Sequence, residues 1–229
     1  MRGLHPGILR QDPSAGRFGG AIYNRLGASR LPPTIPFDTR GVFVRGRWTA
    51  PASGETLPLL NPSDGTPLAE IARGGAADVD AAVRAAQEAI DGDWGHLTAV
   101  ERGRLMLKAS ALVLEEADEL ARLEALDVGK PVKQARADAV ALARYLELYG
   151  GAADKVTGET IPFANGYAAF TWREPHGVTA HIVPWNYPMQ IIGRSVGAAL
   201  AMGNACVLKP AEEACLTALA FARIIERAG

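Results

Sequence analysis

Cysteine and histidine are both scarce in this chain, which limits the chemistry that it can carry. The two cysteines, Cys206 and Cys215, give no disulfide framework, so a reducing compartment, the cytoplasm, is predicted. Cys206 lies in an apolar run typical of a buried strand, where a thiol is usually inert. The four histidines include no pair four residues apart and have no cysteine cluster beside them, so no metal site is predicted.

An excess of basic residues and a long apolar run are also missing. The net charge is −1 and the lysines and arginines are dispersed, so we expect no nucleic-acid partner. The longest mainly apolar segment, 189–202, is interrupted by Arg194 and by glycines. It falls short of the ~20 residues that a membrane helix needs, so no membrane partner is expected either.

The glycine fingerprint of dinucleotide-binding folds, G-x-G-x-x-G, is absent as well. The nearest glycines are Gly193, Gly197 and Gly203, in a run with helical periodicity. We expect the first two to let a helix pack closely on a sheet, and Gly203 to end that helix.

The strongest pattern that is present lies in residues 178–229. The apolar run VTAHIV is followed by the turn PWNYP, a helical run, a second apolar run ACVLKPAEE and another helical run. This order of strand, turn, helix, strand and helix is typical of a parallel α/β sheet. Ligands bind at the carboxyl ends of such strands, so chemistry is expected at 183–188 and 207–212.

The chain before this unit divides into three parts. Residues 1–38 are predicted to be a disordered arm, although their arginine-rich, acid-poor composition is also typical of an organelle transit peptide. Residues 39–155 begin with short antiparallel strands in 41–48, 56–62 and 66–74. Four helices are expected after them, over 77–91, from a capping box at Thr98 and Glu101, over 117–128 and over 131–153.

A β-hairpin is predicted within 156–175, around Asn165 and Gly166. Its edge could pair with a second subunit or within the monomer, and both alternatives remain open. Trp172, like Trp48 and Trp94, is interpreted as a packing residue.

The segments REPHGV, IVPWNYP and ALAMGNACVLKPAEEACLTAL, in that order and spacing, resemble the amino-terminal part of NAD(P)-dependent aldehyde dehydrogenases. With LDVGKP and NPSDGTPLAEI upstream, the resemblance covers about residues 40–229. It implies an α/β fold, an incomplete doubly wound parallel-sheet dinucleotide-binding domain. Short amino-terminal strands, a helical layer and a projecting β-hairpin would accompany this domain, whose first βαβα unit is 176–229.

The resemblance also assigns roles to single residues. It implies that the amide of Asn186 stabilises an oxyanion, although the spacing also allows Asn186 to cap the following helix. Lys209 and Glu212 would hold the ribose hydroxyls of the adenosine half of the cofactor. The residues expected to line the dinucleotide are Ile182, Val183, Pro184 and Trp185. A carboxylate repels a 2′-phosphate, so Glu212 favours NAD over NADP.

In the family, a cysteine nucleophile and a general-base glutamate follow well after the segment that matches KPAEE, and neither Cys206 nor Cys215 occupies that position. We therefore expect a truncated chain, inactive alone, from an enzyme that oxidises an aldehyde to a carboxylic acid through a cysteine thiohemiacetal. The expected partners are an aldehyde and, through the hairpin, further copies of the chain. The alternatives are a non-catalytic oligomerisation or regulatory module and an enzyme that transfers the acyl group to coenzyme A.

Overall fold

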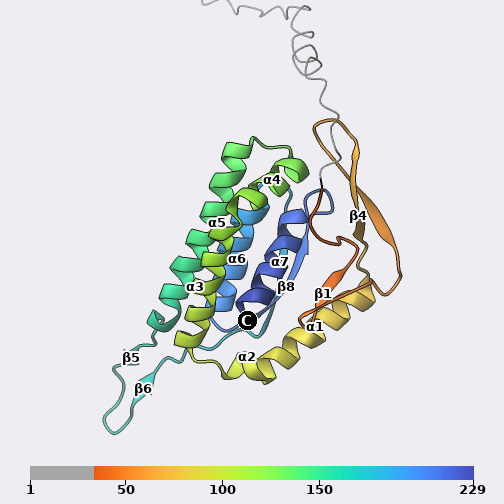
Figure 1. Ribbon diagram of the computed structural model, residues 1–229. Coiled ribbons are helices and arrows are strands. Elements are labelled where there is room, and N and C mark those ends of the chain that lie inside the picture. The colour runs from red at the N-terminus through yellow and green to blue at the C-terminus, as the bar shows by residue number, and fades with distance from the viewer. Residues whose placement is uncertain (1–33) are drawn as a thin grey trace, which may run out of the picture. The chain divides into compact units, whose positions relative to one another are not determined.

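A computed structural model describes residues 34–229 (Figure 1). Four short strands come first, namely β1 (Val42–Val44), β2 (Arg47–Thr49), β3 (Thr56–Leu60) and β4 (Pro67–Ala72). The helices that follow are α1 (Ala76–Asp91), α2 (Asp93–His96), α3 (Ala99–Glu115), α4 (Ala117–Val128) and α5 (Val132–Ala152), the last extended by the 3₁₀ turn η3 (Ala153–Lys155). The remaining elements are β5 (Thr160–Ile161), β6 (Ala169–Phe170), β7 (Val178–Val183), α6 (Pro188–Ala201), β8 (Ala205–Pro210) and α7 (Leu216–Ala228).

The amino-terminal strands form two separate antiparallel pairs, β1 with β2 and β3 with β4. The chain reverses between β1 and β2 at Arg45 and Gly46, which both have positive φ, the conformation of tight hairpin turns. Leu59 and Ile71 anchor the second pair in the hydrophobic core.

The core lies between the helices. α5 packs against α3, α4 and α6, and α7 lies against α3 and α4 (Figure 1). Leu120, Leu142, Leu146, Ile192 and Ile224 are all fully buried there. Each such side chain contributes roughly 1.5–3 kcal/mol by leaving water, so this helical layer is the main source of stability.

The parallel sheet consists of β7 and β8, joined by α6 as the crossover helix. Val178 is paired with Ala205 and Val183 with Pro210, so the two strands end at the same edge. The order β7, α6, β8, α7 is one βαβα unit and confirms the predicted incomplete α/β dinucleotide-binding domain.

β5 and β6 form the hairpin predicted in 156–175, which projects from the rest of the chain (Figure 1). Gly166, with φ +86°, turns the hairpin as expected. The interpretation of Trp172 as a packing residue is wrong, because its side chain is 76% exposed.

The expected helices agree with the observed ones to within a few residues, and the capping box at Thr98 is confirmed. The Thr98 hydroxyl accepts from the Glu101 amide, and the Glu101 carboxylate accepts from the Thr98 amide. The short helix α2 is not among the predicted elements. The expectation that Gly193 and Gly197 let a helix pack on a sheet is corrected. Gly193 faces Tyr145 and Gly197 faces Tyr149, so the two glycines permit contact between α6 and α5.

Gly203, with φ +85°, follows the end of α6 as predicted. Most of the arm predicted over 1–38, namely residues 1–33, lies outside the described residues. Within 34–38, Ile35 and Phe37 pack against the core, so the arm prediction is wrong for this part. The domain boundaries at 39, 156 and 176 stay predictions. No helix within 34–229 combines the length and the apolar character that crossing a bilayer requires.

Candidate functional site

Residues 184–187 form the turn that follows β7 and leads into α6. Trp185, Asn186 and Tyr187 are exposed, whereas Pro188, the first residue of α6, is buried. Proline suits this position because the first helical residue needs no N–H donor. The turn therefore lies on the surface, where the free N–H groups of α6 begin.

Asn186 does not cap α6. The N-cap residue of α6 is Tyr187, and among the described residues no side chain caps this helix. Within residues 34–229, the side-chain amide of Asn186 has no hydrogen-bond partner, while its main-chain oxygen accepts from Lys130. The capping alternative is thus wrong, and the N–H donors of the Asn186 side chain are available to a bound molecule.

The other predicted site residues surround this edge of the sheet. Ile182 is 79% exposed and Trp185 is 59% exposed, so both offer apolar surface. Val183 is only 2% exposed and its side chain belongs to the core, so only the main chain of Val183 can contact a ligand. Pro184, between them, is exposed.

Lys209 and Glu212 lie at the end of β8. Their side chains form an ion pair of 2.8 Å and are both more than half exposed. The hydrogen bond from Lys209 lowers the pKa of the Glu212 carboxyl, which is therefore ionised at neutral pH. Because Val183 and Pro210 are partners in the sheet, this pair and the Asn186 turn belong to the same edge.

Lys130, which the sequence reasoning did not single out, connects this turn to buried charges. Its Nζ atom donates to Glu124 at 3.1 Å, to Asp138 at 2.5 Å and to the main-chain oxygen of Asn186 at 3.1 Å. It also lies 4.2 Å from the centre of the Tyr187 ring. The Glu124 side chain is fully buried, and burial raises its pKa to about 7 although the Lys130 charge opposes that shift.

A signal for this cluster was present in the sequence. Glu124 follows Leu120 by one helical turn and so falls on the apolar face of its helix, where a carboxylate is costly unless it is paired. The motif LDVGKP, which contains Lys130, indicates by itself only the family resemblance.

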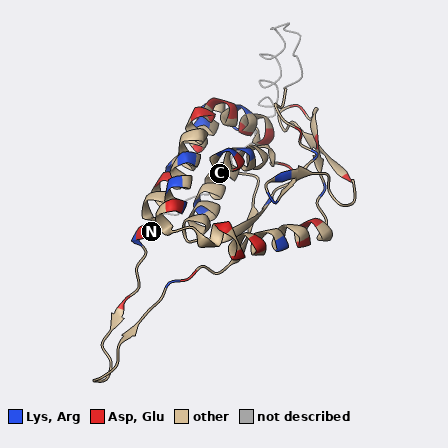
Figure 2. Ribbon diagram, turned by 60° about the horizontal axis from the view of Figure 1, so that its bottom comes forward, with Lys and Arg blue, Asp and Glu red and all other residues tan. Residues whose placement is uncertain are grey.

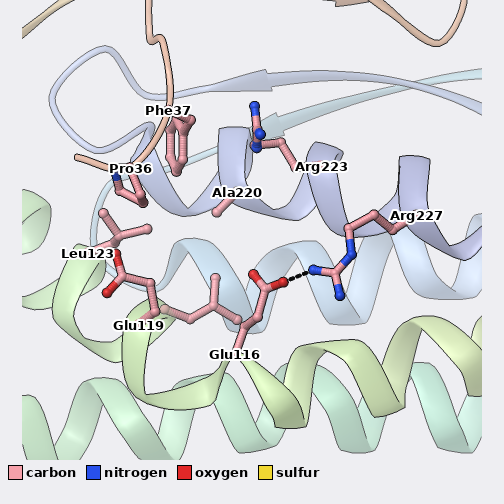
Figure 3. Close-up of a pocket in the computed structure, with 9 residues that line it drawn as sticks. Pro36, Phe37, Glu116, Glu119, Leu123, Ala220, Arg223 and Arg227 are labelled. Atoms are coloured by element: carbon pink, nitrogen blue, oxygen red, sulfur yellow. Dashed lines mark hydrogen bonds and ion pairs between the residues drawn. The ribbon is translucent and has the colours of Figure 1, made fainter.

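A separate pocket of about 220 Å³ lies where α7 meets the junction of α3 and α4 (Figure 3). Arg227 is ion-paired with Glu116, Glu119 is ion-paired with Arg122, and Arg223 lies over the Phe37 ring. It contains none of the predicted site residues. Within residues 34–229, no group of histidines, cysteines and carboxylates is arranged to hold a metal ion.

The sequence matches one protein family over most of its length. Residues 48–229 match the model of the aldehyde dehydrogenase family. This chain belongs to that family.

Individual relatives agree with this assignment. A hydroxyisobutyraldehyde dehydrogenase from Mycolicibacterium austroafricanum is 47% identical over 188 residues, which are 82% of this chain and 37% of that protein. The structure of a Burkholderia cenocepacia protein described as an aldehyde dehydrogenase is 61% identical with a TM-score of 0.81, and the match covers 82% of this chain and 40% of that one. An NAD⁺ complex of a Bacillus cereus aldehyde dehydrogenase is 38% identical with a TM-score of 0.82, covering 85% and 40%. This chain therefore spans about two fifths of the length of these relatives.

The two cysteines of this aldehyde dehydrogenase chain are unsuited to nucleophilic attack. Burial raises the pKa of both thiols, and the charge of Asp127 adds to the shift at Cys215. The Cys206 sulfur accepts from the Thr179 hydroxyl at 3.6 Å, which only partly offsets burial. A thiol must ionise to attack, so neither cysteine has the environment of a nucleophile.

Proposed function

We propose that this chain supplies the cofactor-facing half of an active site that oxidises an aldehyde to a carboxylic acid with NAD. The observation that carries the proposal is the free side-chain amide of Asn186 at the edge where β7 and β8 both end. The family match over residues 48–229 supports the reaction class.

The exposed residues at this edge fit NAD. Ile182 and Trp185 present apolar surface at the end of β7, and the Lys209–Glu212 pair presents hydrogen-bonding groups at the end of β8. An ionised Glu212 accepts from ribose hydroxyls and repels a 2′-phosphate, which favours NAD over NADP. NAD would supply the hydride acceptor for the oxidation.

Asn186 then acts on the aldehyde oxygen. When a thiolate attacks the carbonyl carbon, negative charge develops on that oxygen, and an N–H of Asn186 donates to it. One such donor is worth about 3–4 kcal/mol in comparable sites. The amino-terminal end of α6 adds a partial positive charge beside the turn.

We further propose that the 229-residue chain is inactive alone, with the nucleophilic cysteine and the general-base glutamate of the enzyme beyond residue 229. The raised pKa values of Cys206 and Cys215 support this. Both thiols are free, which suits a reducing compartment such as the cytoplasm. Mixing the chain with NAD and an aldehyde should give no NADH, and formation of NADH that depends on the aldehyde would contradict the proposal.

The exposed surface of the hairpin of β5 and β6 supports a second proposal, that this hairpin forms a contact between subunits. Its apolar side chains are exposed, and it carries few charges (Figure 2). The exposed large hydrophobic residues of the segment 156–175 are Val156, Ile161, Phe163, Tyr167, Phe170 and Trp172. Apolar surface of this kind marks interaction sites, so we propose that a second copy of the chain packs on it. A non-catalytic module that joins longer relatives is the alternative that this surface also supports.

A further inference from the structure

We propose that Lys130 is a positioning residue, which holds the main chain at Asn186 and thereby sets the direction of the Asn186 amide. This inference rests on the oxyanion role proposed for Asn186, which it deepens. It concerns a residue outside the turn, on the loop that joins α4 to α5.

The ammonium group of Lys130 uses all three of its N–H donors. Two go to the carboxylates of Glu124 and Asp138, and the third goes to the main-chain oxygen of Asn186. The Lys130 side chain is only 11% exposed, and those of Glu124 and Asp138 are exposed by no more than 6%. Because the two carboxylates belong to α4 and α5, the third donor connects the turn to two helices of the core.

The start of α6 is tied to the same cluster. Gln190, in the first turn of α6, donates to the second oxygen of Asp138 at 2.6 Å. Tyr187 covers the ammonium with its ring at 4.2 Å, an attractive contact between a cation and an aromatic face. Residues 186–190 are thus held at Asn186 and Tyr187 by Lys130 and at Gln190 by Asp138, its ion-pair partner.

The backbone around Lys130 fixes where its side chain starts. Gly129 has φ +77°, and a side chain there would have its Cβ 3.0 Å from Pro62, so this position requires glycine. Pro131 follows with a restricted φ and is the N-cap of α5. Lys130 is therefore placed between two constrained residues, which limits the directions that its side chain can take.

Buried ion pairs give little net stability, because desolvation offsets much of their attraction, but they can fix a geometry. A role in stability alone would not require the third donor to reach the turn. The two roles separate experimentally, because loss of positioning changes the turn locally, whereas loss of stability affects the whole core.

The test compares the wild-type 229-residue chain with Lys130→Met and with Glu124→Gln/Lys130→Met. The double variant removes one of the two carboxylates that the single variant leaves buried and unpaired. Lys130→Arg keeps the charge and the donors, and Lys133→Met is the matched control, an exposed lysine three residues away. Hydrogen exchange is measured at the Ile191 amide, which donates to the Tyr187 oxygen, and at the buried core residue Leu142.

Removing the Lys130 charge should speed exchange at Ile191 about tenfold relative to Leu142, the effect of losing a hydrogen bond from a charged donor. The side-chain amide signal of Asn186, identified by its loss in Asn186→Ala, should shift in the same variants. Lys130→Arg should restore most of the protection, and Lys133→Met should match the wild type. Equal changes at Ile191 and Leu142, or none at Ile191, would overturn the inference.

A measurement on the wild type covers the case in which the variants do not fold. The Lys130 side-chain signals should be shifted upfield by the Tyr187 ring, and Tyr187→Leu should abolish that shift. Absence of the shift overturns the inference. NAD affinity is measured on the same samples. Failure of the wild type to bind NAD would contradict the proposed function, but the exchange rate at Ile191 would still test the role of Lys130, because that measurement does not need NAD.

Discussion

The Nζ atom of Lys130 lies 3.1 Å from the main-chain oxygen of Asn186, 56 residues further along the chain. Through this contact, the loop after α4 supports the turn that presents the proposed oxyanion donor. The same ammonium neutralises part of the charge on Glu124 and Asp138, so the turn and the buried carboxylates form one electrostatic unit.

Stability should depend on pH through Glu124. Its pKa is about 7 in the folded chain because of burial, whereas in an unfolded chain a glutamate titrates near 4. Between about pH 4 and pH 7 the folded state therefore holds more protons, and the free energy of unfolding falls as pH rises through this window. The loss should be on the order of a few kcal/mol.

Urea unfolding of wild type and Glu124→Gln between pH 5 and pH 8 checks this prediction. Burial also raises the pKa of Asp127 to about 7, which adds a slope of the same sign, and burial lowers the pKa of His181, which adds a slope of the opposite sign. Both groups are present in both proteins, so the difference between the proteins is the informative quantity. Glu124→Gln should gain stability relative to wild type as pH rises, and Glu226→Gln, at an exposed position of α7, should not. If the gain in the free energy of unfolding of Glu124→Gln over wild type shrinks as pH rises, the Glu124 carboxyl does not have a raised pKa in the folded chain.

Glycine substitutions should reveal how closely α3 and α5 approach. A Cβ on Gly103 would lie 2.5 Å from the main-chain oxygen of Gly150, too close for any real contact. Gly103→Ala should therefore lower stability by several kcal/mol, since overpacking and a backbone shift combine.

The matched control is Gly151→Ala, where an added Cβ meets nothing within 4 Å. Alanine is the better helix former, so this change should raise stability by up to about 1 kcal/mol. Thermal unfolding followed by circular dichroism measures both. Equal midpoints for the two variants would contradict the observed helix contact.

Glu212 should decide between NAD and NADP. The wild-type chain should bind NAD more tightly in calorimetric titrations, and Glu212→Gln should reduce that preference by about tenfold, because a like charge facing the 2′-phosphate is removed. Glu213→Gln is the neighbouring control. An unchanged preference in Glu212→Gln would exclude Glu212 as the discriminating group.

Self-association should depend on the exposed hairpin. Phe170→Ser/Trp172→Ser should shift the chain toward monomer in analytical ultracentrifugation, because both side chains lose apolar contact area. Leu148→Ser changes an exposed apolar residue on α5, outside the hairpin, and should leave the mass unchanged. If the wild-type chain is monomeric at all concentrations, the proposed contact between subunits through the hairpin is wrong.

The elements with local signals were predictable from the sequence. Thr98 and Glu101 form a cap within one turn of helix, and Gly129 ends α4 by its own conformation, so three or four residues suffice to recognise each. The βαβα unit was likewise visible in the alternation of apolar runs and helical periodicity.

The support of the site was not predictable in this way. Glu124 and Asp138 bind Lys130, and Lys130 reaches the main-chain oxygen of Asn186, only after α4, α5 and α6 have packed. The position of Glu124 on an apolar helix face indicates a buried carboxylate, but it does not indicate the contact between Lys130 and Asn186. The exposure of Trp172 was missed for the same reason, because an aromatic residue in a strand pattern gives no sign of whether a neighbour covers it.

The central claim, that the edge formed by the ends of β7 and β8 holds the cofactor, is tested most directly by titrating the ¹⁵N-labelled chain with NAD. The amide signals of residues 182–187 and 209–213 should shift together as NAD is added. Shifts confined to other regions, such as the pocket beside Phe37 and Arg223, or no shift at saturating NAD, would contradict the account.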